Sequence, residues 1–130
     1  MAEHPSLQRM RNGSTAFAEG DLAAFDELWT DDIRWHDSGT SPISGTFEGR
    51  QAIFEMFGRL VELTDGSLRV EPRAIVADDE WGFAAITLSA HRADRSLETM
   101  DVHTVRFVDG RVAEFWQTST EPARTDDFYS

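Results

Sequence analysis

The second half of the chain is dominated by four long segments that have the character of β-strands. Each is rich in β-branched, aromatic or alternating apolar residues, and short polar sequences typical of turns separate them. The segments are residues 68–77, 81–92, 97–108 and 111–120. The pair Asp109-Gly110 is the strongest hairpin signal, because Asp and Gly tolerate the positive φ angles of a two-residue turn. Four such strands in succession predict a curved antiparallel sheet.

The first half of the chain carries three amphipathic helical patterns. The first is expected to begin at Ser6 and end at Gly20, the second to begin at Asp21, and the third to cover residues 50–64. A strand is expected after Asp32, and a short one at 44–48. One-sided helices must bury their apolar face against another element. We therefore predict an α+β fold in which the sheet wraps around the N-terminal helices as a cone with an internal pocket.

The length of the chain sets the number of domains. At 130 residues it has about the commonest size of one domain, and no low-complexity tract divides it. We expect residues 1–130 to form a single domain, with 121–130 as a loosely held, polar tail.

The charge of the chain argues against two classes of partner. It has 24 acidic residues against 12 basic ones, and its formal net charge is −12. Such a field repels phosphate backbones and anionic lipid head groups, so neither nucleic-acid nor membrane binding is expected. The chain has no apolar run of about 18 residues, and its start lacks the apolar core of a secretion signal. The expected location is cytoplasmic.

The absent residue types narrow the chemistry. Without Cys there is no thiolate nucleophile and no Cys-based metal site, and without Lys there is no imine catalysis on a side-chain amine. Acid–base chemistry by Asp, Glu and His, or ligand binding without turnover, remains.

Asp37 is the first candidate for such chemistry. The strand that contains it places Ile33, Trp35 and Asp37 on one face. A carboxylate that shares a face with Ile and Trp lies at the mouth of a cavity or has its pKa raised by burial. Alternatively, Asp37 is a turn residue that begins the Ser38-Gly39 loop.

Asp101 and His103 are the second candidate pair. They lie two positions apart in one strand and therefore point to the same face. An Asp so placed can fix the tautomer of the imidazole and raise its basicity, which is typical of a general acid or base. A structural histidine bonded to its neighbour explains the pair equally well.

Several further residues are candidates for ligand contact. They come from the first strand, the third helix and one face of the last strand: Trp35, His36, Phe57, Phe115, Gln117 and Ser119. His36 lies on the opposite side of its strand from Trp35. A metal site of His36, Asp37, Asp101 and His103 matches no recognised ligand spacing, so no metal or cofactor is expected.

The chain resembles the nuclear-transport-factor-2-like superfamily, and within it the SnoaL-like polyketide cyclases and ketosteroid-isomerase-related proteins. The resemblance rests on Gly20-Asp21, residues 29–37, Gly45, residues 49–53 and residues 101–116. It implies a long curved sheet that encloses a mainly apolar cavity ringed by helices. This scaffold carries many activities and many binding roles, so the resemblance is informative about fold and less so about reaction.

The resemblance also assigns roles. Asp37 falls where ketosteroid isomerase has its proton-shuttling Asp, and His103 where it has the protonated Asp of its oxyanion hole. Gly13 falls where that enzyme has a Tyr, and Gln117 where the SnoaL cyclases have an acid–base Asp. These departures argue against steroid isomerisation and against aldol cyclisation.

We therefore predict a small soluble enzyme that moves a proton on an apolar, carbonyl-bearing molecule by isomerisation, cyclisation or dehydration. Asp37 would be the base, and His103, oriented by Asp101, the proton donor or oxyanion partner. A binding or assembly module without turnover is the alternative. Epoxide hydrolysis requires an inward Arg, whereas Arg106 lies on the face opposite His103. The resemblance implies a homodimer across the open sheet face.

Overall fold

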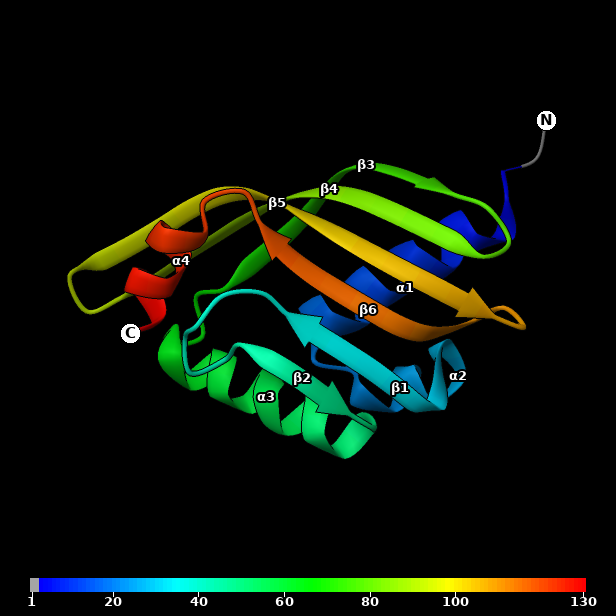
Figure 1. Cartoon of the computed structure of the whole chain (residues 1–130), viewed down its shortest axis with the longest axis horizontal. Coiled ribbons are helices and arrows are strands. Elements are labelled where there is room, and N and C mark those ends of the chain that lie inside the picture. Colours follow the sequence, from blue (N-terminus) through cyan, green and yellow to red (C-terminus); the bar gives the residue numbers. More distant parts are fainter. Residues whose placement is uncertain (1–2) are drawn as a thin grey trace.

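A six-stranded sheet organises the computed structural model, which describes residues 3–130. The elements are α1 (Pro5–Glu19), a 3-10 turn (Leu22–Ala24), α2 (Phe25–Leu28), β1 (Trp29–Asp37), β2 (Gly45–Glu48), α3 (Arg50–Leu63), β3 (Arg69–Ala77), β4 (Trp81–Arg92), β5 (Arg95–Val108), β6 (Arg111–Ser119) and α4 (Pro122–Tyr129). The strand order is β2-β1-β6-β5-β4-β3 (Figure 1). The predicted α+β class with a curved sheet is confirmed.

One strand pairing differs from the predicted antiparallel arrangement. β1 pairs with β6 in parallel, whereas the other four pairings are antiparallel. Parallel neighbours need a long connection, and here the connection is most of the chain. The β5–β6 hairpin forms as predicted, with φ angles of 51° at Asp109 and 79° at Gly110.

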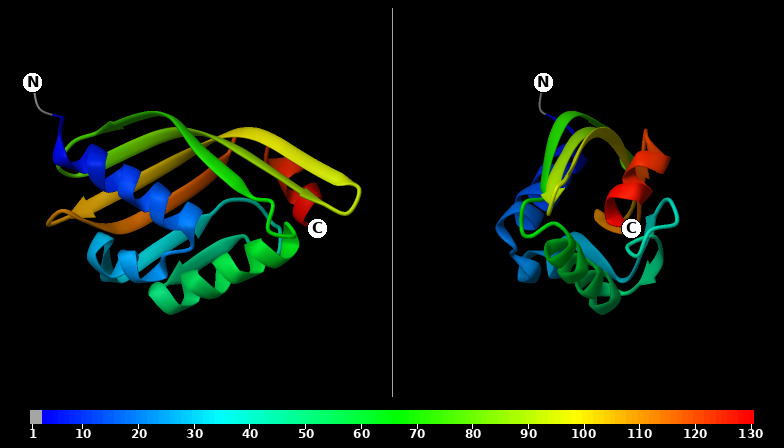
Figure 2. Two further views of the ribbon diagram at one scale, coloured as in Figure 1. Left: turned by 180° about the vertical axis from the view of Figure 1, so that it is seen from behind. Right: turned by 90° about the vertical axis from the view of Figure 1, so that its left-hand side faces the viewer.

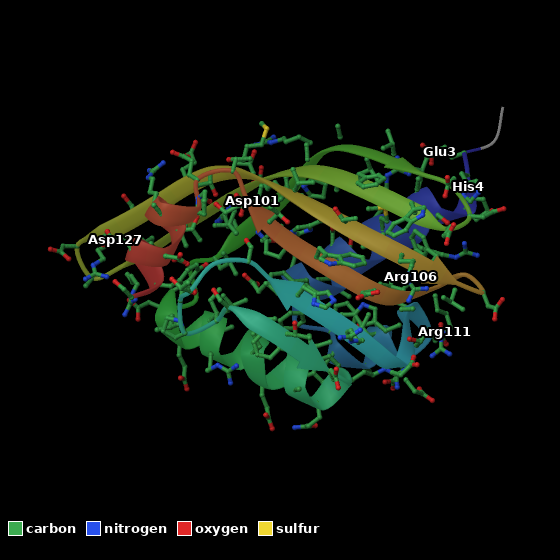
Figure 3. The ribbon with its side chains drawn as sticks, viewed as in Figure 1. Glu3, His4, Asp101, Arg106, Arg111 and Asp127 are labelled. Atoms are coloured by element: carbon green, nitrogen blue, oxygen red, sulfur yellow. The ribbon has the colours of Figure 1, made fainter. Side chains whose placement is uncertain are left out.

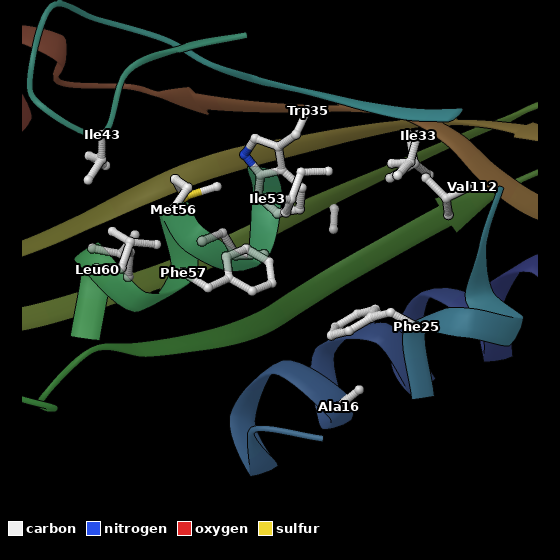
Figure 4. Packing of buried hydrophobic residues seen from close by; sticks show 14 of the residues in the cluster. Ala16, Phe25, Ile33, Trp35, Ile43, Ile53, Met56, Phe57, Leu60 and Val112 are labelled. Carbon is white, nitrogen blue, oxygen red and sulfur yellow. The ribbon is translucent and has the colours of Figure 1, made fainter. Parts of the chain in front are cut away.

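The helices lie on the concave side of the sheet. Seen from behind and from one end, α1 and α3 lie beneath the curved strands, and α4 covers one end of the assembly (Figure 2). The core forms between these layers, where Ile33 of β1 and Ile53 and Met56 of α3 have 0% exposed surface. Trp35 lies close to Phe57 in this core, with a ring-centroid distance of 5.3 Å (Figure 4).

The second helix is shorter than predicted. Asp21 caps a 3-10 turn by accepting from the Ala24 N–H, but α2 is only one turn long and β1 begins at Trp29. Trp29 stacks on Phe25 with a ring-centroid distance of 4.2 Å and pairs with Val112 of β6. Strand β1 therefore begins earlier in the chain than the alternation of apolar and polar residues after Asp32 indicates. Ser6 does not cap α1. The cap is His4, whose Nδ1 accepts from the Ser6 N–H.

The prediction of a loosely held tail is wrong. Residues 122–129 form α4, and Phe128 and Tyr129 are only 3% and 2% exposed. Two arginines of the β4–β5 hairpin donate to backbone carbonyls of this helix, Arg92 to Phe128 at 2.9 Å and Arg95 to Asp127 at 3.0 Å. The polar composition of the segment concealed a helix that docks through two buried aromatic side chains and hydrogen bonds to its backbone.

Ile53→Ala tests the packing of α3 against the sheet. Because Ile53 is fully buried, the substitution is expected to lower the free energy of unfolding by about 2–5 kcal/mol. Val61→Ala on the same helix, where Val61 is 59% exposed, is expected to change it by less than about 0.5 kcal/mol. Urea denaturation measures both, and equal losses would contradict this assignment of the buried face.

Candidate active site

A cavity of about 120 Å³ lies between the concave face of the sheet and the helices. Its wall is mainly apolar and includes Phe17 of α1, Phe57 of α3 and Phe115 of β6. Its polar lining includes Asp37, Asp101, His103, Gln117 and Tyr129. An apolar cavity with a few convergent polar groups is the usual form of a small-molecule site.

Three of the polar residues form one row across adjacent strands. Asp37 of β1 pairs with Gln117 of β6, and Gln117 pairs with His103 of β5. Neighbouring strands lie about 4.8 Å apart, so the three side chains leave the same face side by side. Asp101 lies two residues before His103, on the half of β5 nearer α4 (Figure 3).

Gln117 links the other polar groups. Its side-chain oxygen accepts from His103 Nε2, and its Nε2 donates to Asp101 Oδ2 at 2.7 Å. Asp101 therefore orients His103 through Gln117, not by the direct contact that the sequence suggested. In this arrangement Nε2 of His103 carries the proton and Nδ1 keeps its lone pair.

His103 is not the strong base that the sequence predicted. Burial lowers the pKa of His103 to about 4, only partly offset by its hydrogen bond to Gln117. The imidazole is therefore neutral at pH 7. The expectation of raised basicity failed because the carboxylate of Asp101 bonds to the amide and not to the ring.

Asp37 has the opposite shift. Burial raises the pKa of Asp37 to about 7, and the charges of Asp101 and Asp126 act in the same direction. The indole N–H of Trp35 offsets part of this rise, although it makes no hydrogen bond of good geometry. Burial also raises the pKa of Asp101. A carboxyl group with a pKa near 7 is suited to general-base work near neutral pH.

The apolar candidates lie together in the wall. Trp35 and Phe115 stack with their ring centroids 3.8 Å apart and their planes at 7°, and Phe57 meets Trp35 edge-on. This stack lies one row along the sheet from Asp37 and Gln117, because Trp35 pairs with Phe115. The stacked rings form an apolar boundary beside the polar row of Asp37, Gln117 and His103.

Two predicted contact residues lie elsewhere. His36 is on the convex face, where it bonds to Glu114 at 2.6 Å and to Thr46 at 3.0 Å. Ser119 faces inward beside Asp101, but it is not part of the cavity wall and its hydroxyl bonds to Thr125 at 2.7 Å. The structure therefore places His36 away from the cavity and Ser119 next to its polar residues, outside the wall.

Tyr129 and Arg9 are among the cavity-lining residues that were not predicted as site residues from the sequence. Tyr129 enters from α4, and the only signal for it was an aromatic pair in a polar segment. Arg9 of α1 supplies an inward arginine, but its guanidinium lies beside Gly110, at the far end of β5 from Asp101. Arg106 is on the convex face, 3.5 Å from Glu114. A carboxylate–arginine–carboxylate set for epoxide opening is not assembled.

The four residues considered as metal ligands are not brought together, because His36 faces away from the other three. Within residues 3–130, no three His, Asp or Glu side chains are placed to hold an ion. None of the helices in this range is both long and apolar enough to cross a bilayer.

Comparisons with known proteins find a matching family model, relatives in sequence and solved structures of the same fold. A model of the SnoaL-like domain matches residues 10–115. An uncharacterized protein of Mycobacterium tuberculosis is 24% identical over 131 residues, which cover 100% of both chains. Bal32a, from a soil-derived mobile gene cassette, has a TM-score of 0.91 and 28% identity, with 97% of each chain covered. A putative SnoaL-like polyketide cyclase from Jannaschia has a TM-score of 0.79 at 14% identity, covers 97% of this chain and 92% of its own, and supports the fold alone.

The raised pKa of Asp37 predicts that the stability of the wild-type protein depends on pH in a way that the stability of Asp37→Asn does not. Folding destabilises the charged carboxylate, so the free energy of unfolding falls as the pH rises from the ordinary value of 3.8 to about 7. Asp37→Asn cannot ionise and so lacks this loss. From pH 4 to pH 8 its free energy of unfolding should therefore increase relative to that of the wild type by up to about 4 kcal/mol. Chemical denaturation across this range measures the difference. Asp32→Asn, at an exposed position of the same strand, should show none, and parallel curves for wild type and Asp37→Asn would contradict the assignment.

Proposed function

Because the chain belongs to the SnoaL-like family, we propose that it is an enzyme that moves a proton on an apolar, carbonyl-bearing small molecule by isomerisation, cyclisation or dehydration. The observation that carries the proposal is the buried carboxyl group of Asp37, whose pKa is raised to about 7 beside an apolar cavity. Buried titratable groups with shifted pKa values are concentrated at functional sites.

The proposed step begins with a ligand whose carbonyl group lies in the polar end of the cavity. Asp37, as the carboxylate, takes a proton from the carbon next to the carbonyl, and the electron pair of the broken C–H bond moves toward oxygen to give an enolate. Returning the proton to a different carbon completes an isomerisation. The stacked rings of Trp35 and Phe115 would hold the apolar body of the ligand against the sheet.

The polar row favours a mechanism with one base. His103 is neutral, because burial lowers its pKa to about 4, and the Gln117 amide does not ionise at neutral pH. Asp37 therefore both removes and returns the proton. A single shuttling base suits isomerisation better than a dehydration that needs a separate acid.

The size of the cavity limits the ligand. An engineered apolar cavity of about 150 Å³ binds benzene, so a cavity of about 120 Å³ limits the ligand to about one ring. Single-ring ketones are therefore the first probes.

The alternative is a binding module without turnover. It is favoured by the amide at position 117 and by the neutral imidazole, since neither supplies a second acid–base group. In this case Asp37 would serve only to hydrogen-bond the ligand.

Exchange of hydrogen for deuterium separates the two functions. Acetophenone in D₂O should exchange its methyl protons faster with the wild-type protein, because Asp37 removes a proton reversibly. Asp37→Asn should slow this exchange by about 100-fold or more, while Asp32→Asn should leave it unchanged. The rate, followed by proton NMR, should rise with pH up to about 7 as Asp37 ionises. Saturable binding of acetophenone with no more exchange than in Asp37→Asn would favour the binding module.

We also propose that the protein is a homodimer through the convex face of the sheet. Four apolar side chains are exposed there, Val76 (63%), Met100 (55%), Phe83 (45%) and Val102 (37%). Their strands, β3, β4 and β5, are adjacent, so the side chains form one patch, and exposed apolar patches of this kind mark protein interfaces. A small-molecule ligand and a second copy are thus the proposed partners, and the cytoplasm remains the expected location.

Glutamate substitutions test the dimer. Phe83→Glu combined with Val102→Glu places four charges in a two-fold interface, and it should convert a dimer at micromolar concentration into a monomer in sedimentation velocity experiments. Val61→Glu, an exposed position on α3, is the control and should remain a dimer. A monomeric wild-type protein at this concentration would overturn the proposal.

A further inference from the structure

The phenol of Tyr129 is a buried polar group that the proposed mechanism has not used. Tyr129 is the last residue of α4, is 2% exposed and lines the cavity together with Asp37 and Asp101. Within residues 3–130, its hydroxyl makes no hydrogen bond, and its oxygen is not fully enclosed by protein atoms, so it opens into the cavity. A buried hydroxyl without a partner costs free energy, and most such groups in proteins are satisfied. The missing partner at a cavity wall indicates an acceptor on a ligand.

We propose that Tyr129 is a catalytic residue that donates a hydrogen bond to the carbonyl oxygen of the ligand, and that α4 is therefore part of the active site. This inference rests on the proposed function for its chemistry, although the donor role applies equally to a ligand that is bound without turnover. Gly13, where the resemblance places the Tyr of ketosteroid isomerase, lines the same cavity without a side chain, so a phenol reaches this cavity from α4 and not from α1.

The protonation state of Tyr129 suits a donor. Burial raises the pKa of the phenol above its ordinary value, and the charges of Asp37 and Asp101 raise it further. The group therefore keeps its proton throughout the neutral range. Tyr129, Asp37 and Asp101 line the same cavity, so one ligand can contact the phenol and the carboxyl groups together. Asp37 is then the acceptor of the reacting proton and Tyr129 the donor to oxygen.

Three elements hold α4 in place. Arg92 and Arg95, from the β4–β5 hairpin, donate to carbonyls at the C-terminal end of the helix. The Asp126 carboxylate accepts from the Thr40 backbone N–H at 3.0 Å, which ties the helix to the β1–β2 loop. The Thr125 hydroxyl bonds to Ser119 of β6. A donor fixed before the ligand arrives loses little freedom in the reaction.

The chemical step follows from this placement. The carbon next to the carbonyl loses its proton to an Asp37 oxygen, the C–H electron pair forms the C=C bond of the enolate, and the π pair of the C=O bond moves onto oxygen. The Tyr129 O–H keeps its proton and donates a hydrogen bond that strengthens as the charge on oxygen grows. No oxidant, metal or second reactant is needed.

Tyr129→Phe tests the proposal because it removes only the hydroxyl. The infrared carbonyl band of acetophenone bound to the wild type should lie at lower wavenumber than the band of acetophenone bound to Tyr129→Phe, since the carbonyl loses its donor. The rate of methyl exchange in D₂O at saturating acetophenone should fall by about 100-fold, with a small change in KM. Thr15→Val, which removes an exposed hydroxyl from α1, should match the wild type in both measurements.

The two measurements distinguish the two proposals. A band shift that is lost in Tyr129→Phe, without exchange in the wild type, would support the donor role and overturn the enzymatic function. Exchange that persists unchanged in Tyr129→Phe, with an unshifted band, would overturn the donor role and leave the function intact. Failure of acetophenone to bind at all would overturn both.

A second variant tests the contribution of α4. Arg92→Ala combined with Arg95→Ala removes the donors to its carbonyls and should loosen the helix without altering the cavity wall. Amide exchange in residues 122–129 should become faster, and the carbonyl band should move toward its position in Tyr129→Phe. Arg73→Ala, at an exposed position of β3, is the matched control. A faster-exchanging helix with an unchanged band would contradict the proposed role of α4.

Discussion

Backbone hydrogen bonds between β1 and β6 join the first strand of the sheet to the last one in the chain, and the geometry of the site depends on them. This parallel pairing places Asp37 opposite Gln117 and Trp35 opposite Phe115. The next pairing, of β6 with β5, adds His103 to the same row. A shift of β1 by one residue would turn Asp37 to the convex face and bring His36 into the cavity. The buried side chains of Ile33 and Trp35 oppose such a shift, so the packing that stabilises the fold also sets the register of the polar groups.

The site is maintained against an electrostatic cost. Burial raises the pKa of Asp37 to about 7 and lowers that of His103 to about 4, so both groups lose hydration that they have in the unfolded chain. Gln117 limits this cost by donating to Asp101 and accepting from His103. The amide replaces a direct contact between carboxylate and imidazole, and burial keeps His103 neutral. Asp37 is thereby the group in this row that changes charge near neutral pH, which is why a single-base reaction is the simplest chemistry for the cavity.

The C-terminal helix closes the polar end of the cavity. Its docking depends on two arginines that reach carbonyls of the last turn, and on contacts with the β1–β2 loop and β6. The same docking buries Tyr129 in the wall of the cavity that Asp37 and Asp101 also line. Residues from both ends of the sequence thus line one cavity, with apolar side chains from α1 and α3 and the phenol of Tyr129 from α4.

Much of the fold could be read from the sequence, because local periodicity determines strands, helix faces and turns. The alternation in β1 and β5 correctly placed Asp37 with Trp35 and Asp101 with His103, and Asp109-Gly110 correctly marked a hairpin. The site itself depended on contacts between residues far apart in the chain. No local sequence signal indicates that Asp37, Gln117 and His103 form one row, or that Gln117 bridges Asp101 and His103. Nor does one indicate that α4 places Tyr129 in the cavity wall, since packing decides strand register and helix docking. The pKa values follow from that packing too, because the tertiary structure alone determines how far each group is removed from water.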